Sequence, residues 1–74
     1  MPVRRNMRLE WIDGAEIKVT AENDEIVISA NREGMLSLAK HLTLLADGVK
    51  GDHIHYDESN SLAEGSAELI VERI

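Results

Sequence analysis

The chain has 74 residues, no cysteine and a formal net charge of −6. A chain of this length forms a single domain, residues 1–74, and buries only about 60% of the surface that it exposes when unfolded, which disfavours a deep enzyme cleft. Without cysteine there is no disulfide framework and no thiolate zinc site, so the core has to come from aliphatic packing.

The acidic excess is uneven along the chain, because Arg4, Arg5 and Arg8 all lie near the N-terminus. Residues 9–74 carry fourteen acidic and five basic residues. Nucleic acid is a poor partner for such a protein, since phosphate binding requires cationic surface. A basic protein is a better partner, because complementary potentials accelerate encounter. The alternative is that the acidity only keeps a small protein in solution.

The sequence contains no apolar run after its basic start and no stretch of about eighteen apolar residues. It therefore predicts neither a signal peptide nor a membrane span. We expect a cytoplasmic protein whose residues 1–6 form a flexible terminus.

Three strands are predicted before the first helical pattern. Three segments show the two-residue periodicity that is typical of β-strands. They are MRLEWID, AEIKVTA and EIVISA, residues 7–13, 15–21 and 25–30. Two tight-turn signals separate them, Asp13-Gly14 and Asn23-Asp24. The expected arrangement is a three-stranded meander.

A helix is predicted over residues 32–47, with Asn31 as its N-cap. Its apolar residues recur at helical spacing and predict a buried face that includes Met35, Leu38, Leu42 and Leu45. Ser37 falls largely on the opposite side, and we expect His41 at the surface. Leu36 and Leu44 widen the apolar stripe, either as boundary core residues or as a surface for self-association.

Two further strands are predicted after the helix, in DHIHYDE and AELIVERI, on either side of the polar loop SNSLAEGS. The expected fold class is α+β, a single mainly antiparallel sheet with one helix on one face, in the order β-β-β-α-β-β. The other face of the sheet is left for water, a second copy of the chain in a homodimer, or a partner. Of the two aromatic residues, Trp11 and Tyr56, we expect at least one in the core.

The segment after the helix raises the question of a site. Alternation places His53, His55 and Asp57 together on the open face, with Ile54 and Tyr56 directed toward the helix. Two histidines and a carboxylate are a ligand set for a metal ion. The same pattern also describes the polar side of any half-exposed strand. Neither a nucleophile elbow nor a glycine-rich phosphate loop accompanies it, so the sequence predicts no cofactor and no catalytic residues.

Three stretches resemble a family of small immunity proteins from bacterial polymorphic toxin systems. They are NREGMLSLAKHLTLLA, GDHIHYDE and SLAEGSAELIVERI, and they span roughly the last three fifths of the chain. The helix start, the His-x-His-x-Asp strand and the Leu-x-x-Gly-Ser segment carry the resemblance. It implies a protein without enzymatic activity that binds a cognate toxin and blocks it.

Two hypotheses result. In the first, an immunity protein docks on its toxin, with a basic nuclease as one candidate class, and the partner-binding residues lie on the open face and in the loop from Asp57 to Gly65. We predict them to be His53, His55, Asp57, Glu58 and Glu64. In the second, a small metal-dependent or acid-base enzyme uses His53, His55 and Asp57.

Overall fold

The computed structural model describes residues 9–74, so the terminus expected to be flexible, residues 1–6, lies outside the described residues. One helix and four strands follow one another in the order β-β-α-β-β. Their bounds are β1 Ile17–Glu22, β2 Glu25–Ala30, α1 Arg32–Ala46, β3 His53–Tyr56 and β4 Leu69–Glu72.

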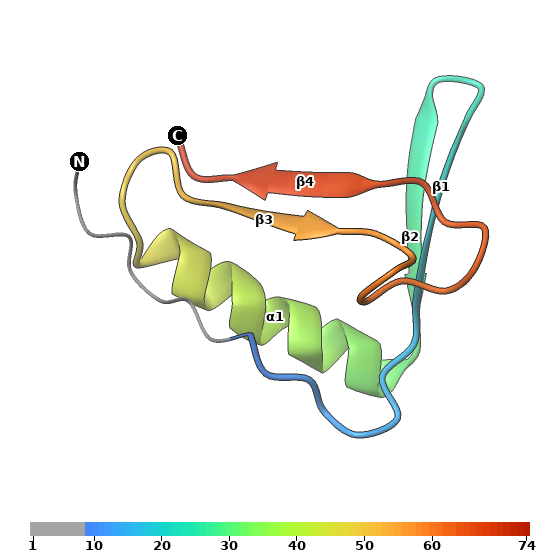
Figure 1. Ribbon diagram of the computed structural model, residues 1–74, viewed down its shortest axis with the longest axis horizontal. Helices are drawn as coiled ribbons and strands as arrows, with labels where there is room; N and C mark the ends of the chain where they lie inside the picture. Colours follow the sequence, from blue (N-terminus) through green and yellow to red (C-terminus); the bar gives the residue numbers. More distant parts are fainter. Residues whose placement is uncertain (1–8) are drawn as a thin grey trace.

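The strands form two separate antiparallel hairpins, β1–β2 and β3–β4, on either side of the helix in sequence. In Figure 1 the β3–β4 hairpin runs along α1, while the β1–β2 hairpin stands across one end of the molecule with its tip projecting. Residues 9–16 pass along the other side of the helix. The predicted α+β class is therefore confirmed, but the prediction of a single sheet was wrong.

The predicted first strand was also wrong within its described part, because residues 9–12 pair with no strand. Two of their backbone groups bond to helix side chains instead. The Ile12 N–H donates to Ser37 Oγ at 2.9 Å, and the Glu10 carbonyl accepts from His41 Nε2 at 2.8 Å. An alternating segment can thus meet its hydrogen-bonding requirement without a neighbouring strand.

A loop prevents the two hairpins from joining into one sheet. The outer edge of β1 is covered by residues 63–67, whose Ala63 and Ala67 N–H groups donate to the carbonyls of Ile17 and Val19, each at 2.8 Å. Because the loop occupies this edge, β3 and β4 pair only with each other.

The β1–β2 turn confirms the predicted signal at Asn23-Asp24. Both residues adopt positive φ, 51° and 63°, which a two-residue hairpin turn of type I′ requires and which Asn and Asp tolerate. The resulting register pairs Glu22 with Glu25 and Ile17 with Ala30.

The helix begins as predicted, with Asn31 as its N-cap. The Asn31 Oδ1 accepts from the Gly34 N–H at 2.8 Å and also from the Glu16 N–H at 3.0 Å. The Asn31 Nδ2 donates to the Gly14 carbonyl at 2.8 Å. One side chain therefore caps α1 and fastens the preceding segment to its first turn.

The buried face of α1 differs from the predicted one. Met35 and Leu42 are 52% and 47% exposed, and Leu38 is only partly buried, so of the four predicted residues Leu45 alone is fully buried. The buried positions are Gly34, Ser37, His41 and Leu45.

The predicted surface position of His41 and the predicted outward position of Ser37 were wrong for one physical reason. Both polar side chains are buried because they form hydrogen bonds there. The Ser37 hydroxyl donates to the Glu33 carbonyl at 2.8 Å while it accepts from Ile12, and both nitrogens of His41 are bonded. A hydropathy pattern alone places such residues at the surface, because it contains no information about which hydrogen-bond partners are available in the interior.

His41 lies within an aromatic cluster with Trp11 and Tyr56. The Trp11 ring meets His41 edge-on at a centroid distance of 4.5 Å and Tyr56 at 6.1 Å. Because a carbonyl can only accept, His41 Nε2 carries the proton donated to Glu10, and the Tyr56 hydroxyl donates to the unprotonated Nδ1 at 2.9 Å. The expectation that at least one aromatic residue lies in the core is confirmed by Tyr56, which is fully buried.

The core is small and draws on β1, α1, β3 and the loop after β3, while β2, β4 and residues 9–16 contribute only partly buried residues. Its buried hydrophobic members are Ile17, Val19, Leu45, Ile54, Tyr56 and Leu62.

We predict that Gly34→Ala destabilises the protein. An added Cβ would lie 2.5 Å from the Glu16 carbonyl oxygen and 3.0 Å from Ile17 Cγ1, so the helix start would have to move away from β1. Overpacking of this kind costs about 1–3 kcal/mol, which exceeds the gain of about 1 kcal/mol from the better helix propensity of alanine. Urea unfolding measures the difference. Thr43→Ala on the exposed side of α1 is the control, and a Gly34→Ala protein at least as stable as wild type would contradict the close packing.

We also predict an alkaline transition of Tyr56. Burial raises the pKa of Tyr56 from 10.0 to about 12. The folded state therefore holds the phenolic proton more tightly than the unfolded state, and the resulting stability is complete below pH 10 and is lost as the pH rises toward 12. The loss amounts to about 2–3 kcal/mol.

Tyr56 is the only tyrosine, so tyrosinate absorbance reports on it directly. The midpoint should lie near 12 in the native protein and near 10 in denaturant. Tyr56→Phe should unfold more easily at neutral pH, because His41 Nδ1 loses its donor, and should lack the additional alkaline loss. A native midpoint near 10 would show that the hydroxyl is not held as described.

Candidate functional site

The two histidines of β3 lie where alternation places them. His53 and His55 are exposed on the face directed away from the helix, while Ile54 and Tyr56 are buried. The two imidazole rings are 5.4 Å apart between centroids. His53 Nδ1 is bonded to the Gly51 carbonyl at 3.2 Å, which fixes its ring near the start of the strand.

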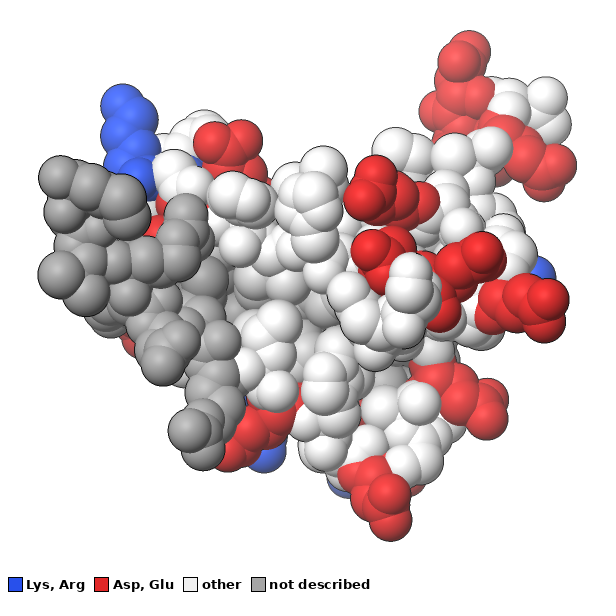
Figure 2. Space-filling view, viewed as in Figure 1, with Lys and Arg blue, Asp and Glu red and all other residues white. Residues whose placement is uncertain are grey.

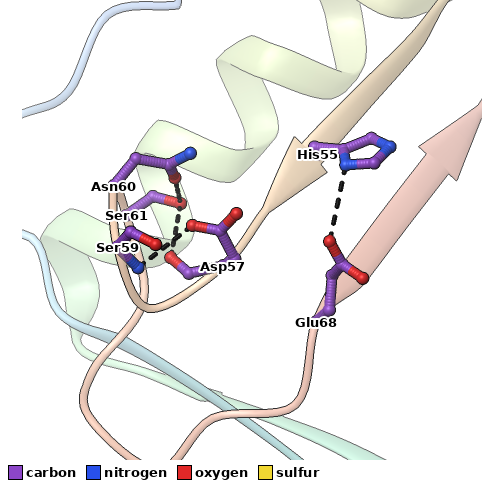
Figure 3. A network of polar contacts seen from close by, with 6 residues as sticks. All are labelled: His55, Asp57, Ser59, Asn60, Ser61 and Glu68. Carbon is purple, nitrogen blue, oxygen red and sulfur yellow. Dashed lines mark hydrogen bonds and ion pairs between the residues drawn. The ribbon is translucent and has the colours of Figure 1, made fainter.

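The antiparallel register adds residues that sequence reasoning did not assign to this face. Glu72 lies opposite His53 and Ile70 lies opposite His55, and Glu68 precedes β4. The Glu68 carboxylate is 3.5 Å from His55 Nδ1, in a pair that is about half exposed (Figure 3). The alternation of the closing strand was the signal that could have placed Ile70 and Glu72 outward.

The polar loop after β3 is ordered by Asp57. Its carboxylate oxygen Oδ1 accepts from the Ser59 N–H at 3.0 Å, and its backbone carbonyl accepts from the N–H groups of Ser61 and Leu62. Ser61 also bonds to the Asn60 side chain (Figure 3). The carboxylate of Asp57 is thus turned into the loop rather than toward the histidines.

Glu58 closes the same loop from the other side. Its carboxylate accepts from the Gly65 N–H at 2.8 Å, and Gly65 has a φ of +86°, which glycine adopts without strain. Leu62 is buried in the core, and Ser66 Oγ accepts from the Val19 N–H at 3.1 Å. We call residues 57–65 the acidic loop; its conformation is fixed by hydrogen bonds at both ends and by a buried leucine between them.

Negative charge surrounds the acidic loop. Glu58 and Glu64 are exposed within it, and Glu68 follows it. Figure 2 shows acidic side chains gathered at the end of the molecule that carries this loop and the β1–β2 hairpin, where basic ones are few. Of the predicted partner-binding residues, His53, His55, Glu58 and Glu64 are exposed, and Asp57 is partly buried.

The arrangement is poorly suited to a metal ion. Within residues 9–74 no group of three or more histidine or carboxylate side chains is placed to hold one. His53, His55 and Asp57 lie along one strand and its exit, but Asp57 already serves the loop. The surface formed by the acidic loop and the open face of the β3–β4 hairpin is instead acidic and partly apolar, and the loop backbone is held in one conformation.

Comparison with protein families decides the class. Residues 25–74, which are more than half of the chain, match the family described as Immunity protein 32. The chain belongs to this family. The resemblance predicted from the sequence is confirmed, and immunity proteins of this kind inhibit toxins without enzymatic activity, so the enzyme hypothesis is set aside. Membership implies binding to a cognate toxin.

In the structure, the segments that carried the resemblance have structural roles. The helix start of this Immunity protein 32 member supplies the Asn31 cap and the close contact of Gly34, and its Gly65-Ser66 pair holds the acidic loop against β1. Comparison with curated proteins and with solved structures gives no match. No helix within residues 9–74 is long and apolar enough to cross a membrane.

We predict that zinc does not stabilise the protein. A metal present at about 100 times its dissociation constant would add about 2.7 kcal/mol of stability, so a real site would raise the melting temperature clearly. Thermal unfolding with stoichiometric zinc should match unfolding without it. A saturable rise that disappears in His53→Ala, but not in the exposed helix variant Thr43→Ala, would establish a metal site on β3.

Proposed function

We propose that this protein neutralises its cognate toxin by docking the acidic loop and the open face of the β3–β4 hairpin onto a basic surface of the toxin. The observation that carries the proposal is the fixed conformation of residues 57–65 beside exposed acidic side chains. A toxin that binds nucleic acid, such as a nuclease, presents the basic surface that this arrangement complements.

The ordered loop favours tight binding. A loop that is disordered when free loses conformational entropy on binding, whereas the acidic loop is already held by Asp57, Glu58 and Leu62. Its charged groups are therefore presented in a defined arrangement at little additional cost.

The flanking hairpin face supplies contacts of a different kind. Ile70 is 52% exposed beside His55, so an apolar contact lies next to the charged ones. Interfaces commonly combine an apolar centre with a polar rim. In this arrangement Ile70 forms the centre, and the histidines, Glu64 and Glu68 form the rim.

The structure determines which acidic residues are useful in a test. Reversal of Asp57 or Glu58 would break hydrogen bonds that hold the loop, so a loss of binding would be ambiguous. Glu64 forms no side-chain hydrogen bond or ion pair with the described residues, and Glu68 forms only the exposed pair with His55. Replacing these two carboxylates therefore changes the charge without breaking a hydrogen bond that holds the loop.

We predict that Glu64→Lys combined with Glu68→Lys slows association with the toxin while the protein stays folded. The probe is the protein encoded next to this gene, confirmed as the partner by co-purification. Steering by complementary charge raises association rates by about 10–1,000-fold at low ionic strength, so we expect at least a tenfold decrease there and a flatter salt dependence.

The matched control is Glu10→Lys combined with Glu22→Lys, which changes the net charge equally at exposed positions outside residues 57–68. Association rates across ionic strength and survival of toxin-expressing cells are the measurements. If the Glu64 and Glu68 variant protects cells and associates like wild type, the acidic loop is not the docking surface. If both variants are impaired equally, only total charge matters.

A further inference from the structure

The outer edge of β2 is the one part of the β1–β2 hairpin that residues 9–74 leave uncovered and apolar. The other edge of this hairpin is closed, because β1 directs the N–H and C=O of Val19 toward the loop residues Ser66 and Ala67. In an antiparallel pair these groups alternate in direction, so Val19 and its partner Ile28 form a pair without mutual hydrogen bonds.

This alternation determines which backbone N–H and C=O groups of β2 point away from β1. The backbone groups of Ile28 point away from β1, and by the same alternation so do those of Ile26 and Ala30. No hydrogen bond from these groups to a neighbouring segment is present within residues 9–74. Ile26 is 71% exposed and Ile28 is 39% exposed. Natural sheet edges are usually protected by lysine, proline, a bulge or an inward-pointing charge. Ile26, Ile28 and Ala30 provide none of these.

We propose that this edge pairs with the same edge of a second copy of the chain, so that two β1–β2 hairpins form one four-stranded antiparallel sheet. The two-fold axis passes between Ile28 of one copy and Ile28 of the other. In this register Ile28 pairs with Ile28 of the second copy and Ile26 pairs with Ala30, so every outward-directed residue of β2 is used.

Shape favours this occupant. Antiparallel pairing about a two-fold axis keeps the same face of the sheet on the same side in both copies. The projecting tip of each hairpin (Figure 1) is thereby laid beside the helix end of the other hairpin, and Ile26, the most exposed isoleucine of β2, is covered there. A shift by two residues would instead place the turn residue Asp24 opposite Ala30 and leave part of the edge unpaired.

Charge favours the same register. The tip carries Asp24 and Glu25, and continued pairing brings them to the start of α1 in the second copy, where Arg32 is exposed and the helix dipole is positive. Arg32 forms no ion pair with the described residues of its own chain. Glu33 in the first turn opposes this attraction in part, so the pairing depends on the backbone ladder as well as on charge.

Cysteine cross-linking tests the register directly, because the natural chain contains no cysteine. In a hydrogen-bonded antiparallel pair the Cα atoms are about 5.5 Å apart, within the range that a disulfide spans. Under mild oxidation Ile28→Cys should form a covalent dimer by itself. Ile26→Cys and Ala30→Cys should each remain monomeric alone and cross-link when mixed with each other. Thr20→Cys on β1 is the collision control.

A second variant tests association without a thiol. Proline at position 28 removes an N–H that points outward and leaves the β1–β2 ladder intact, as edge strands allow. Sedimentation of the wild-type chain should show a mass that doubles with concentration in the micromolar range, typical of a small interface, and Ile28→Pro should stay at the monomer mass. Circular dichroism confirms that each variant is folded.

A wild-type chain that remains monomeric, or cross-linking of Thr20→Cys equal to that of Ile28→Cys, would overturn the proposal. If the toxin protects Ile28→Cys in a stable one-to-one complex while the free chain is monomeric, the edge binds toxin rather than a second copy. The dimer does not depend on the acidic loop, so its failure leaves the proposed docking surface standing, and failure of the charge reversal leaves the dimer standing.

Discussion

The buried His41 holds the architecture together, because one imidazole connects three segments that form no sheet with one another. Its Nδ1 accepts from Tyr56 in β3, its Nε2 donates to the Glu10 carbonyl in the N-terminal segment, and its own backbone belongs to α1. A buried polar group of this kind costs free energy unless every partner is in place. The arrangement therefore selects one relative position of helix, hairpin and leading segment.

The same principle governs the acidic loop. A protein with so few core residues cannot hold a long polar segment by apolar packing alone, so the loop uses its own carboxylates, Asp57 and Glu58, as internal acceptors. Two of its three negative charges thus serve conformation, and the third, that of Glu64, remains available to a partner. Acidity in this protein has two physical roles, which composition cannot distinguish.

Sequence patterns predicted the elements whose cause is local. The Asn31 cap, the Asn23-Asp24 turn and the alternation of β3 each depend on neighbours within a few residues, and all three are present. The family resemblance rested on such segments as well. The errors concern partners distant in sequence.

Leu42 has the hydropathy of a core residue and His41 does not, yet their positions are reversed, because the groups that meet α1 are a tyrosine hydroxyl and a backbone carbonyl. Likewise, residues 9–12 alternate like a strand but meet helix side chains, and β1 meets a loop where a neighbouring strand was expected. For the site, the two histidines were placed correctly on the open face. Alternation could also have placed Ile70 outward, but the pairing of His55 with Ile70 and Glu68 depends on a strand register that no local pattern contains.

The hydrogen bonds between residues 63–67 and β1 affect where the folding unit of this protein can be taken to begin. The family match begins at residue 25, after β1 has ended. A fragment cut at that boundary would keep the acidic loop but lose the Ile17 and Val19 carbonyls to which the loop is fastened, along with two of the buried core side chains. The recognisable segment and the cooperative folding unit are therefore different lengths of chain, and the surface offered to a toxin depends on residues that the family pattern does not include.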